Sequence, residues 1–113
     1  MLRKFSMNPS IANHLPFITT LCERYGVAHL ALFGSATGTE FNPKTSDVDF
    51  LVELDMQAPG SPAQRWIALA EALEELLGRH VDLLNPRYIR NPYFLQAVNA
   101  NRTIIYDRKN VHG

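Results

Sequence analysis

A strand pattern that opens with two acidic residues places the strictest limit on how this chain folds. Apolar side chains at positions 48, 50 and 52 alternate with Asp47, Asp49 and Leu51. A period of two is typical of a β-strand, so both carboxylates project from one face, about 7 Å apart. The residues after the pair are apolar on both faces, which predicts a central strand, although an isolated Asp-x-Asp also occurs on solvent-facing edges. Carboxylates at the end of a buried strand are costly unless a cation such as Mg²⁺ neutralises them.

A second short apolar run, residues 27–33, ends at a glycine-serine pair. It has no helical length and predicts a buried strand. Gly34 allows the backbone to approach a ligand closely, and Ser35 offers a hydroxyl and an N–H to a phosphate oxygen. An ordinary strand-ending turn is the alternative for Gly-Ser alone. The order of strand, Gly-Ser, polar loop and Asp-x-Asp is what favours a phosphate site.

Apolar periodicity predicts the other elements of an α/β fold. The first two strands are joined by a loop of about a dozen residues, too short for a parallel crossover, so we expect antiparallel neighbours. The strand after the second helix could lie parallel to one of them, giving a small mixed β-sheet with helices packed against it. In the second helix, the inward stripe is predicted to be Trp66, Ala70, Leu73 and Leu77. The predicted order is a helix at 10–26, strands at 27–33 and 47–53, a helix at 61–78, a strand at 80–84, a helix at 91–100 and a strand at 103–106.

Size, charge and cysteine content exclude several classes of protein. We expect one domain over residues 1–113, with a core at about 10–107 and loose termini. Lysine plus arginine and aspartate plus glutamate number 11 each, so no strong nucleic-acid binding is expected. The single cysteine, Cys22, excludes an internal disulfide and a Cys-based zinc site, and is predicted to be a buried thiol. No run approaches the roughly 20 apolar residues of a membrane span, so we expect a cytoplasmic protein.

Taken together, the motifs resemble the nucleotidyltransferase superfamily of the DNA polymerase β type, and closely its shortest members, the minimal nucleotidyltransferase (MNT) domains. The likeness covers roughly Val27 to Tyr106 and implies the polymerase β-like palm fold. The matching segments are LFGS at 32–35, FNPKTS at 41–46, DVDFLV at 47–52, HVDLL at 80–84, NPYF at 91–94 and IIY at 104–106.

This resemblance also implies roles for individual residues. Asp47 and Asp49 would bind the metal ions that bridge a nucleoside triphosphate. Asp82 would complete the metal-binding triad and help to activate the attacking hydroxyl. The family's phosphate turn corresponds to Gly34 and Ser35, which would hold the β and γ phosphates.

Three further features qualify the likeness. Ser46, directly before the acidic pair, is the other expected nucleotide-binding residue. The glycine at position 38 stands one place earlier than the family's usual glycine, and the turn contains no arginine. The nearest cation is Lys44, which as a loop lysine could equally be solvated. The roles of Arg87, Arg90 and Arg102, at a phosphate, at a partner or in solvent, stay open.

We therefore expect a Mg²⁺-dependent enzyme that transfers a nucleotidyl group, AMP from ATP or the nucleotide of another triphosphate. Free-standing domains of this kind resemble antitoxins whose partner is a helical HEPN-type toxin, and the implied acceptor is a tyrosine of that toxin. One alternative is an antitoxin that neutralises its partner by contact alone. Another is the nucleotide-binding subunit of a two-component small-molecule nucleotidyltransferase. The three aspartates favour the enzyme.

Overall fold

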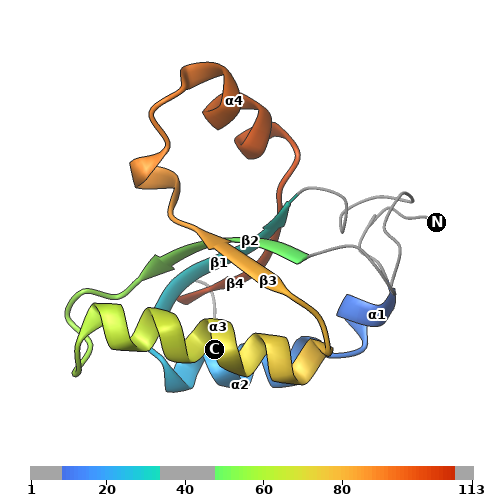
Figure 1. Cartoon of the computed structure of the whole chain (residues 1–113), viewed down its shortest axis with the longest axis vertical. Coiled ribbons are helices and arrows are strands. Elements are labelled where there is room, and N and C mark those ends of the chain that lie inside the picture. The colour runs from blue at the N-terminus through green and yellow to red at the C-terminus, as the bar shows by residue number, and fades with distance from the viewer. Residues whose placement is uncertain (1–8, 34–47, 109–113) are drawn as a thin grey trace.

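The computed structural model describes residues 9–33 and 48–108, which form a four-stranded mixed sheet with helices on both sides (Figure 1). The elements in chain order are α1 (Pro9–Ala12), α2 (Leu15–Arg24), β1 (Val27–Phe33), β2 (Val48–Leu54), α3 (Pro62–Leu77), β3 (Val81–Leu84), the short 3₁₀ helix η2 (Pro86–Tyr88), α4 (Pro92–Ala100) and β4 (Thr103–Asp107).

The sheet has the strand order β3-β2-β1-β4. β1 pairs antiparallel with β2, and β3 pairs parallel with β2, which confirms both predicted directions. β4 closes the other side by pairing antiparallel with β1. The two strands that carry the chemistry, β2 and β3, are therefore neighbours, joined through α3 as a parallel crossover requires.

The predicted single helix over residues 10–26 is wrong as one helix. It is divided into α1 and α2 by a turn at Asn13 and His14. Pro16 accounts for the break, because proline has no N–H to donate to the carbonyl of Ala12 four residues earlier, and its ring crowds that carbonyl. At the start of α2 the missing N–H costs nothing, since the first turn has no intrahelical acceptors.

The helix α3 begins and ends where predicted, but its buried face is displaced. Ser61 Oγ accepts from the Gln64 N–H, and Gly78 ends the helix at φ +70°. The predicted stripe is corrected at Ala70 and Trp66, which are only partly buried. The residues that point inward follow a spacing of four: Arg65, Leu69, Leu73 and Leu77.

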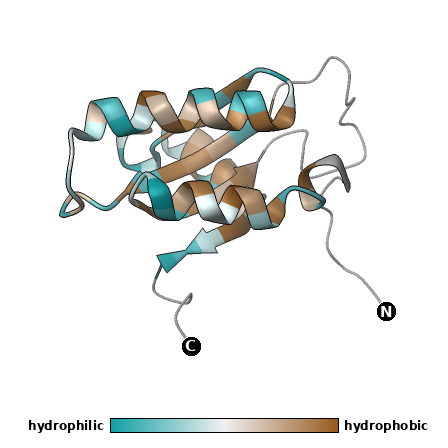
Figure 2. Cartoon of the chain, turned by 90° about the horizontal axis from the view of Figure 1, so that it is seen from below, coloured by the Kyte–Doolittle hydropathy of each residue, from teal (hydrophilic) through white to brown (hydrophobic). Residues whose placement is uncertain are grey.

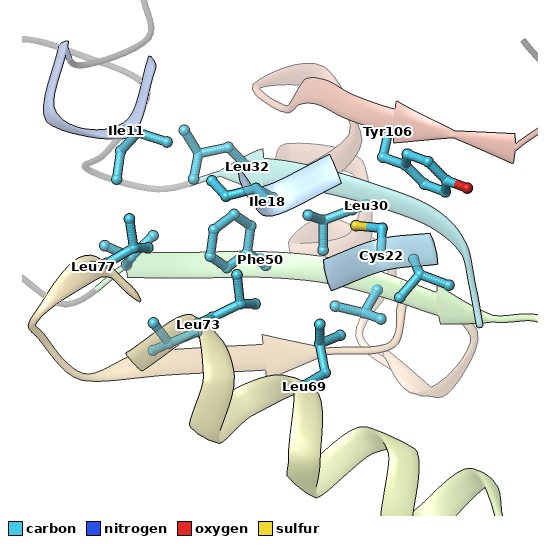
Figure 3. Packing of buried hydrophobic residues seen from close by; sticks show 14 residues of the cluster. Ile11, Ile18, Cys22, Leu30, Leu32, Phe50, Leu69, Leu73, Leu77 and Tyr106 are labelled. Atoms are coloured by element: carbon cyan, nitrogen blue, oxygen red, sulfur yellow. The ribbon is translucent and has the colours of Figure 1, made fainter. Parts of the chain in front are cut away.

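The main hydrophobic core lies between the sheet and the helices α2 and α3. Seen from the helix side, the strands are largely hydrophobic behind helices that carry both kinds of residue (Figure 2). Phe50 of β2 is fully buried at the centre, among Ile18, Leu32 and Leu73 (Figure 3). Cys22 is buried here as predicted, and burial, followed by the charge of Glu23, raises its pKa to about 12.

The opposite face of the sheet is covered more lightly. α4 stands on this side, away from α2 and α3 (Figure 1). A second, smaller cluster joins its Val98 to Ala31 and Leu51 of the sheet. No helix in the described part of the chain is long and apolar enough to span a membrane.

Candidate active site

Two of the predicted catalytic carboxylates lie side by side on neighbouring strands. Asp49 of β2 and Asp82 of β3 are paired in register across the parallel ladder. Neighbouring strands lie about 4.8 Å apart, and residues in register on parallel strands point to the same face. Carboxylates separated in the chain by all of α3 are thus within reach of one ligand.

Both aspartates face away from the main core. The residues that flank them, Val48 and Phe50 on β2 and Val81 on β3, are buried under α2 and α3. Alternation along a strand directs Asp49 and Asp82 to the other face, on the side of α4. The Asp82 side chain is 50% exposed, so the site opens to solvent and could admit a ligand.

The end of β1 lies beside the same pair. Phe33, its last residue, is the antiparallel partner of Asp49. Gly34 follows Phe33 in the chain, as the predicted phosphate turn requires. The predicted residues Gly34, Ser35, Ser46 and Asp47 lie outside the described residues, so their roles, like those of Asp49 and Asp82, stay predictions.

The donor atoms present suit a hard divalent cation. Asp49 and Asp82 offer carboxylate oxygens, and Mg²⁺ takes one or two carboxylates together with phosphate oxygens and water. Among residues 9–33 and 48–108, no group of three or more histidine, cysteine, aspartate or glutamate side chains is placed to hold a metal ion. Two carboxylates fit an ion whose other ligands are phosphate oxygens and water.

A histidine that the sequence did not mark as part of the site lies beside Asp82. His80 is exposed, and its Nε2 lies 2.8 Å from Oδ1 of Asp82. Its Nδ1 lies 3.0 Å from Oε2 of Glu74 on α3. The spacing in the sequence could have indicated this contact, because residues 80 and 82 of an extended chain lie on the same face.

The basic residues divide between two ends of the sheet. Arg102 directly precedes Thr103, and Thr103 pairs with Leu32 near the end of β1. Arg102 therefore lies at the same end of the sheet as Asp49. Arg87 instead lies past the end of β3, with its Nε 3.8 Å from the carboxylate of Glu53. Because Glu53 and Asp49 lie at opposite ends of β2, Arg87 does not contact the carboxylate pair. Lys44 lies outside the described residues.

A groove of about 660 Å³ also lies at that far end, next to Arg87. Its walls include Trp66, Met56 and Tyr88 and are mostly apolar. It contains neither Asp49 nor Asp82. A triphosphate–metal site needs oxygen ligands, so the carboxylate pair, and not this groove, is the candidate active site.

Comparison with known proteins agrees with this geometry. The profile of a family described as nucleotidyltransferase domain matches residues 17–109. A Methanocaldococcus jannaschii protein named "Putative protein adenylyltransferase" is 37% identical over 81 residues, covering 72% of this chain and 79% of that protein. A solved structure described as a "putative minimal nucleotidyltransferase" is 27% identical with a TM-score of 0.63, covering 82% of this chain and 90% of that chain.

A more distant likeness concerns the fold alone. A chain from the complex of a tri-AMPylated Shewanella oneidensis HEPN toxin with an MNT antitoxin has a TM-score of 0.58 at 22% identity. The match covers 87% of this chain and 73% of that chain. With the profile match, the sequence relative and the paired carboxylates in agreement, this chain is a nucleotidyltransferase and belongs to the nucleotidyltransferase domain family.

Proposed function

We propose that this protein transfers AMP from ATP to a tyrosine of a HEPN-type toxin, and that it acts as the antitoxin of that pair. The observation that carries the proposal is the registered placement of Asp49 beside Asp82 on the open face of the sheet. The relative named as a protein adenylyltransferase supports AMP as the transferred group and a protein as the acceptor. We also propose that the reaction takes place in the cytoplasm, where ATP is available.

We assign Mg²⁺ to Asp49 and Asp82, with Asp47 as the third ligand. When bound, the metal neutralises charge on the triphosphate and polarises the phosphoryl oxygens. The protein's part is then mainly positioning, which two neighbouring strands of one sheet perform well because their backbones are held by the ladder. Gly34, Ser35 and Ser46 are the proposed contacts to the phosphates and nucleotide.

In the proposed transfer, the tyrosine oxygen forms a bond to the α phosphorus of ATP. The bond from that phosphorus to the oxygen bridging it to the β phosphate breaks, and pyrophosphate leaves with the bonding electrons. We assign the departing phenolic proton to the Asp82 carboxylate, which helps to activate the attacking hydroxyl. AMP stays on the tyrosine through a phosphodiester linkage.

The proposed acceptor is a tyrosine hydroxyl on a partner protein. An antitoxin of the same fold is found with an AMPylated HEPN toxin, and this likeness concerns the fold alone. The open face beside Asp82 is consistent with an acceptor that arrives on another protein, because half of that side chain is exposed. A tyrosine hydroxyl, with an ordinary pKa of about 10, needs a nearby base or metal to react at neutral pH.

The first experiment is a calorimetric titration of ATP with Mg²⁺ into the wild type, Asp49→Asn and Asp82→Asn. These substitutions keep the side-chain shape and remove the charge. Glu71→Gln, on an exposed part of α3, is the matched control. We expect binding by the wild type and the control, and weakened binding by both aspartate variants.

The second experiment tests transfer. Each variant is incubated with its cognate HEPN-type toxin, ATP and Mg²⁺, and the intact mass of the toxin is measured. We expect the mass of AMP to be added by the wild type, and about 10²–10³-fold more slowly by either aspartate variant. Silencing of the toxin without added mass would contradict the proposal and identify an antitoxin that acts by contact alone.

A further inference from the structure

The imidazole of His80 lies between two carboxylates that come from different elements. Its Nε2 is 2.8 Å from Asp82 Oδ1, and its Nδ1 is 3.0 Å from Glu74 Oε2. A proton on Nε2 makes the ring a donor to Asp82, and a proton on Nδ1 makes it a donor to Glu74. The ring thus connects the end of α3 to the carboxylate at the proposed active site.

Glu74 and the backbone of His80 are themselves held in place. The Glu74 Oε2 atom also accepts from the Val81 N–H at 3.1 Å, which fixes the carboxylate against the start of β3. The His80 carbonyl accepts from the Val48 N–H at 3.1 Å, so the backbone next to Asp49 is tied to the same residue. The ring is thus held by side chains of α3 and β3, while the backbone of His80 is held by β2.

Among residues 9–33 and 48–108, the Asp82 carboxylate is held by its contact with His80. Its side chain is 50% exposed, and an exposed aspartate samples three staggered χ1 wells. A donor placed on one carboxylate oxygen selects among these rotamers and leaves the second oxygen for another ligand. Partners of this kind orient the ligands of metal sites, and their loss typically costs about 10–100-fold in metal affinity or activity.

We propose that His80, held by Glu74, is a positioning residue that orients the Asp82 carboxylate toward Asp49 for metal binding. This inference rests on the proposed function, since it needs Asp82 to be a metal ligand. In this arrangement Glu74 holds His80, and His80 orients Asp82. Neither His80 nor Glu74 contacts the metal ion directly.

The chain offers two substitutions that separate the contacts of the ring. In His80→Gln, the amide nitrogen occupies roughly the place of Nε2 and keeps the donor to Asp82. In His80→Asn, the amide nitrogen occupies roughly the place of Nδ1 and keeps only the contact with Glu74. Glu75→Gln, next to Glu74 but exposed, is the matched control for Glu74→Gln.

The test measures Mn²⁺ binding at fixed pH by electron paramagnetic resonance of the free ion, since Mn²⁺ favours the same oxygen ligands as Mg²⁺. We expect His80→Ala and His80→Asn to weaken binding about tenfold, and Glu74→Gln to weaken it less. His80→Gln is expected to stay within about threefold of the wild type. Thermal unfolding of every variant verifies the fold.

A double-mutant cycle with Asp82→Ala separates positioning from a merely structural role. We expect His80→Ala to have no further effect on Mn²⁺ binding once Asp82 is absent. An equal loss in both backgrounds, or rescue by His80→Asn and not by His80→Gln, would overturn the inference. If Asp82→Ala weakens Mn²⁺ binding and His80→Ala does not, only the inference on His80 fails. If Asp82→Ala binds Mn²⁺ like the wild type, the proposed metal site fails as well.

Discussion

Two glycines with the same backbone conformation provide a quantitative test of the packing around Arg65. Gly26 has φ +69° and Gly78 has φ +70°, both in the left-handed region. An alanine in this region costs about 1–2 kcal/mol from its own backbone. For Gly78, an added Cβ would meet no atom of the described residues within 4 Å. The free energy of unfolding should therefore fall in Gly78→Ala by about 1–2 kcal/mol only.

At Gly26 the same methyl group meets a buried guanidinium. The added Cβ would lie 2.5 Å from Arg65 Nη1 and 2.9 Å from the Ala58 Cβ. Arg65 is only 8% exposed, and its Nη1 donates to the carbonyls of Tyr25 and Gly26, while Nη2 donates to that of Asp55. In an open site the end of an arginine could move aside, but here three carbonyls hold it.

Displacing the guanidinium gives up at least one hydrogen bond from a charged donor, worth about 1.5–3 kcal/mol. We therefore expect Gly26→Ala to destabilise the protein by about 2 kcal/mol more than Gly78→Ala. Urea unfolding at 25 °C, followed by the fluorescence of Trp66, measures both values. In an Arg65→Ala background the gap should shrink to about 1 kcal/mol or less, because the clash with the guanidinium is gone. Equal destabilisation by the two glycine variants in the wild-type background would refute the reasoning.

Three further predictions concern the core, a buried thiol and a helix cap. Phe50→Ala should lower the free energy of unfolding by about 3–5 kcal/mol, because removing this fully buried ring leaves a cavity at the centre of the core. A loss of less than about 1 kcal/mol in a urea titration would contradict this. Cys22 should resist thiol reagents at pH 8 until the protein unfolds. The pKa of this thiol is raised from 9.0 to about 12, so its contribution to the free energy of unfolding is present below pH 9 and is lost as the pH rises toward 12. In Cys22→Ala the free energy of unfolding, measured from pH 8 to 10.5, should therefore fall less steeply with pH. Asn91 accepts from the N–H groups of Tyr93 and Phe94, so Asn91→Ala should speed hydrogen exchange within α4, at a local cost of about 1 kcal/mol, with unchanged exchange in α3 as the control.

Local chemistry explains why most elements could be predicted. Ser61 and Gly78 bound α3 because a capping hydroxyl and a left-handed glycine act on their immediate neighbours. The sequence could also have predicted the divided first helix, since Pro16 cannot donate to the carbonyl four residues earlier. These signals depend on side chains within one turn of each other, so they need no knowledge of the fold.

Arg65 and His80 make contacts that local sequence patterns could not predict. The guanidinium of Arg65 binds carbonyls 39 and 40 residues away, so its burial could not follow from helical periodicity, which placed Trp66 on the inward face instead. His80 contacts Glu74 only because the chain turns sharply after α3. The buried guanidinium of Arg65 and the imidazole of His80 both depend on partners that come near only when the chain folds.

By itself, the sequence determined which face of its strand each carboxylate occupies, because alternation of side chains is a local property of extended backbone. Through the resemblance, it also implied that Asp82 completes a metal-binding triad with Asp47 and Asp49. Only the tertiary structure decided that Asp49 and Asp82 are paired in register on neighbouring parallel strands, with His80 against Asp82. The physical reason is that pairing between parallel strands is set by how the intervening helix packs across the sheet, and that packing is a property of the whole core.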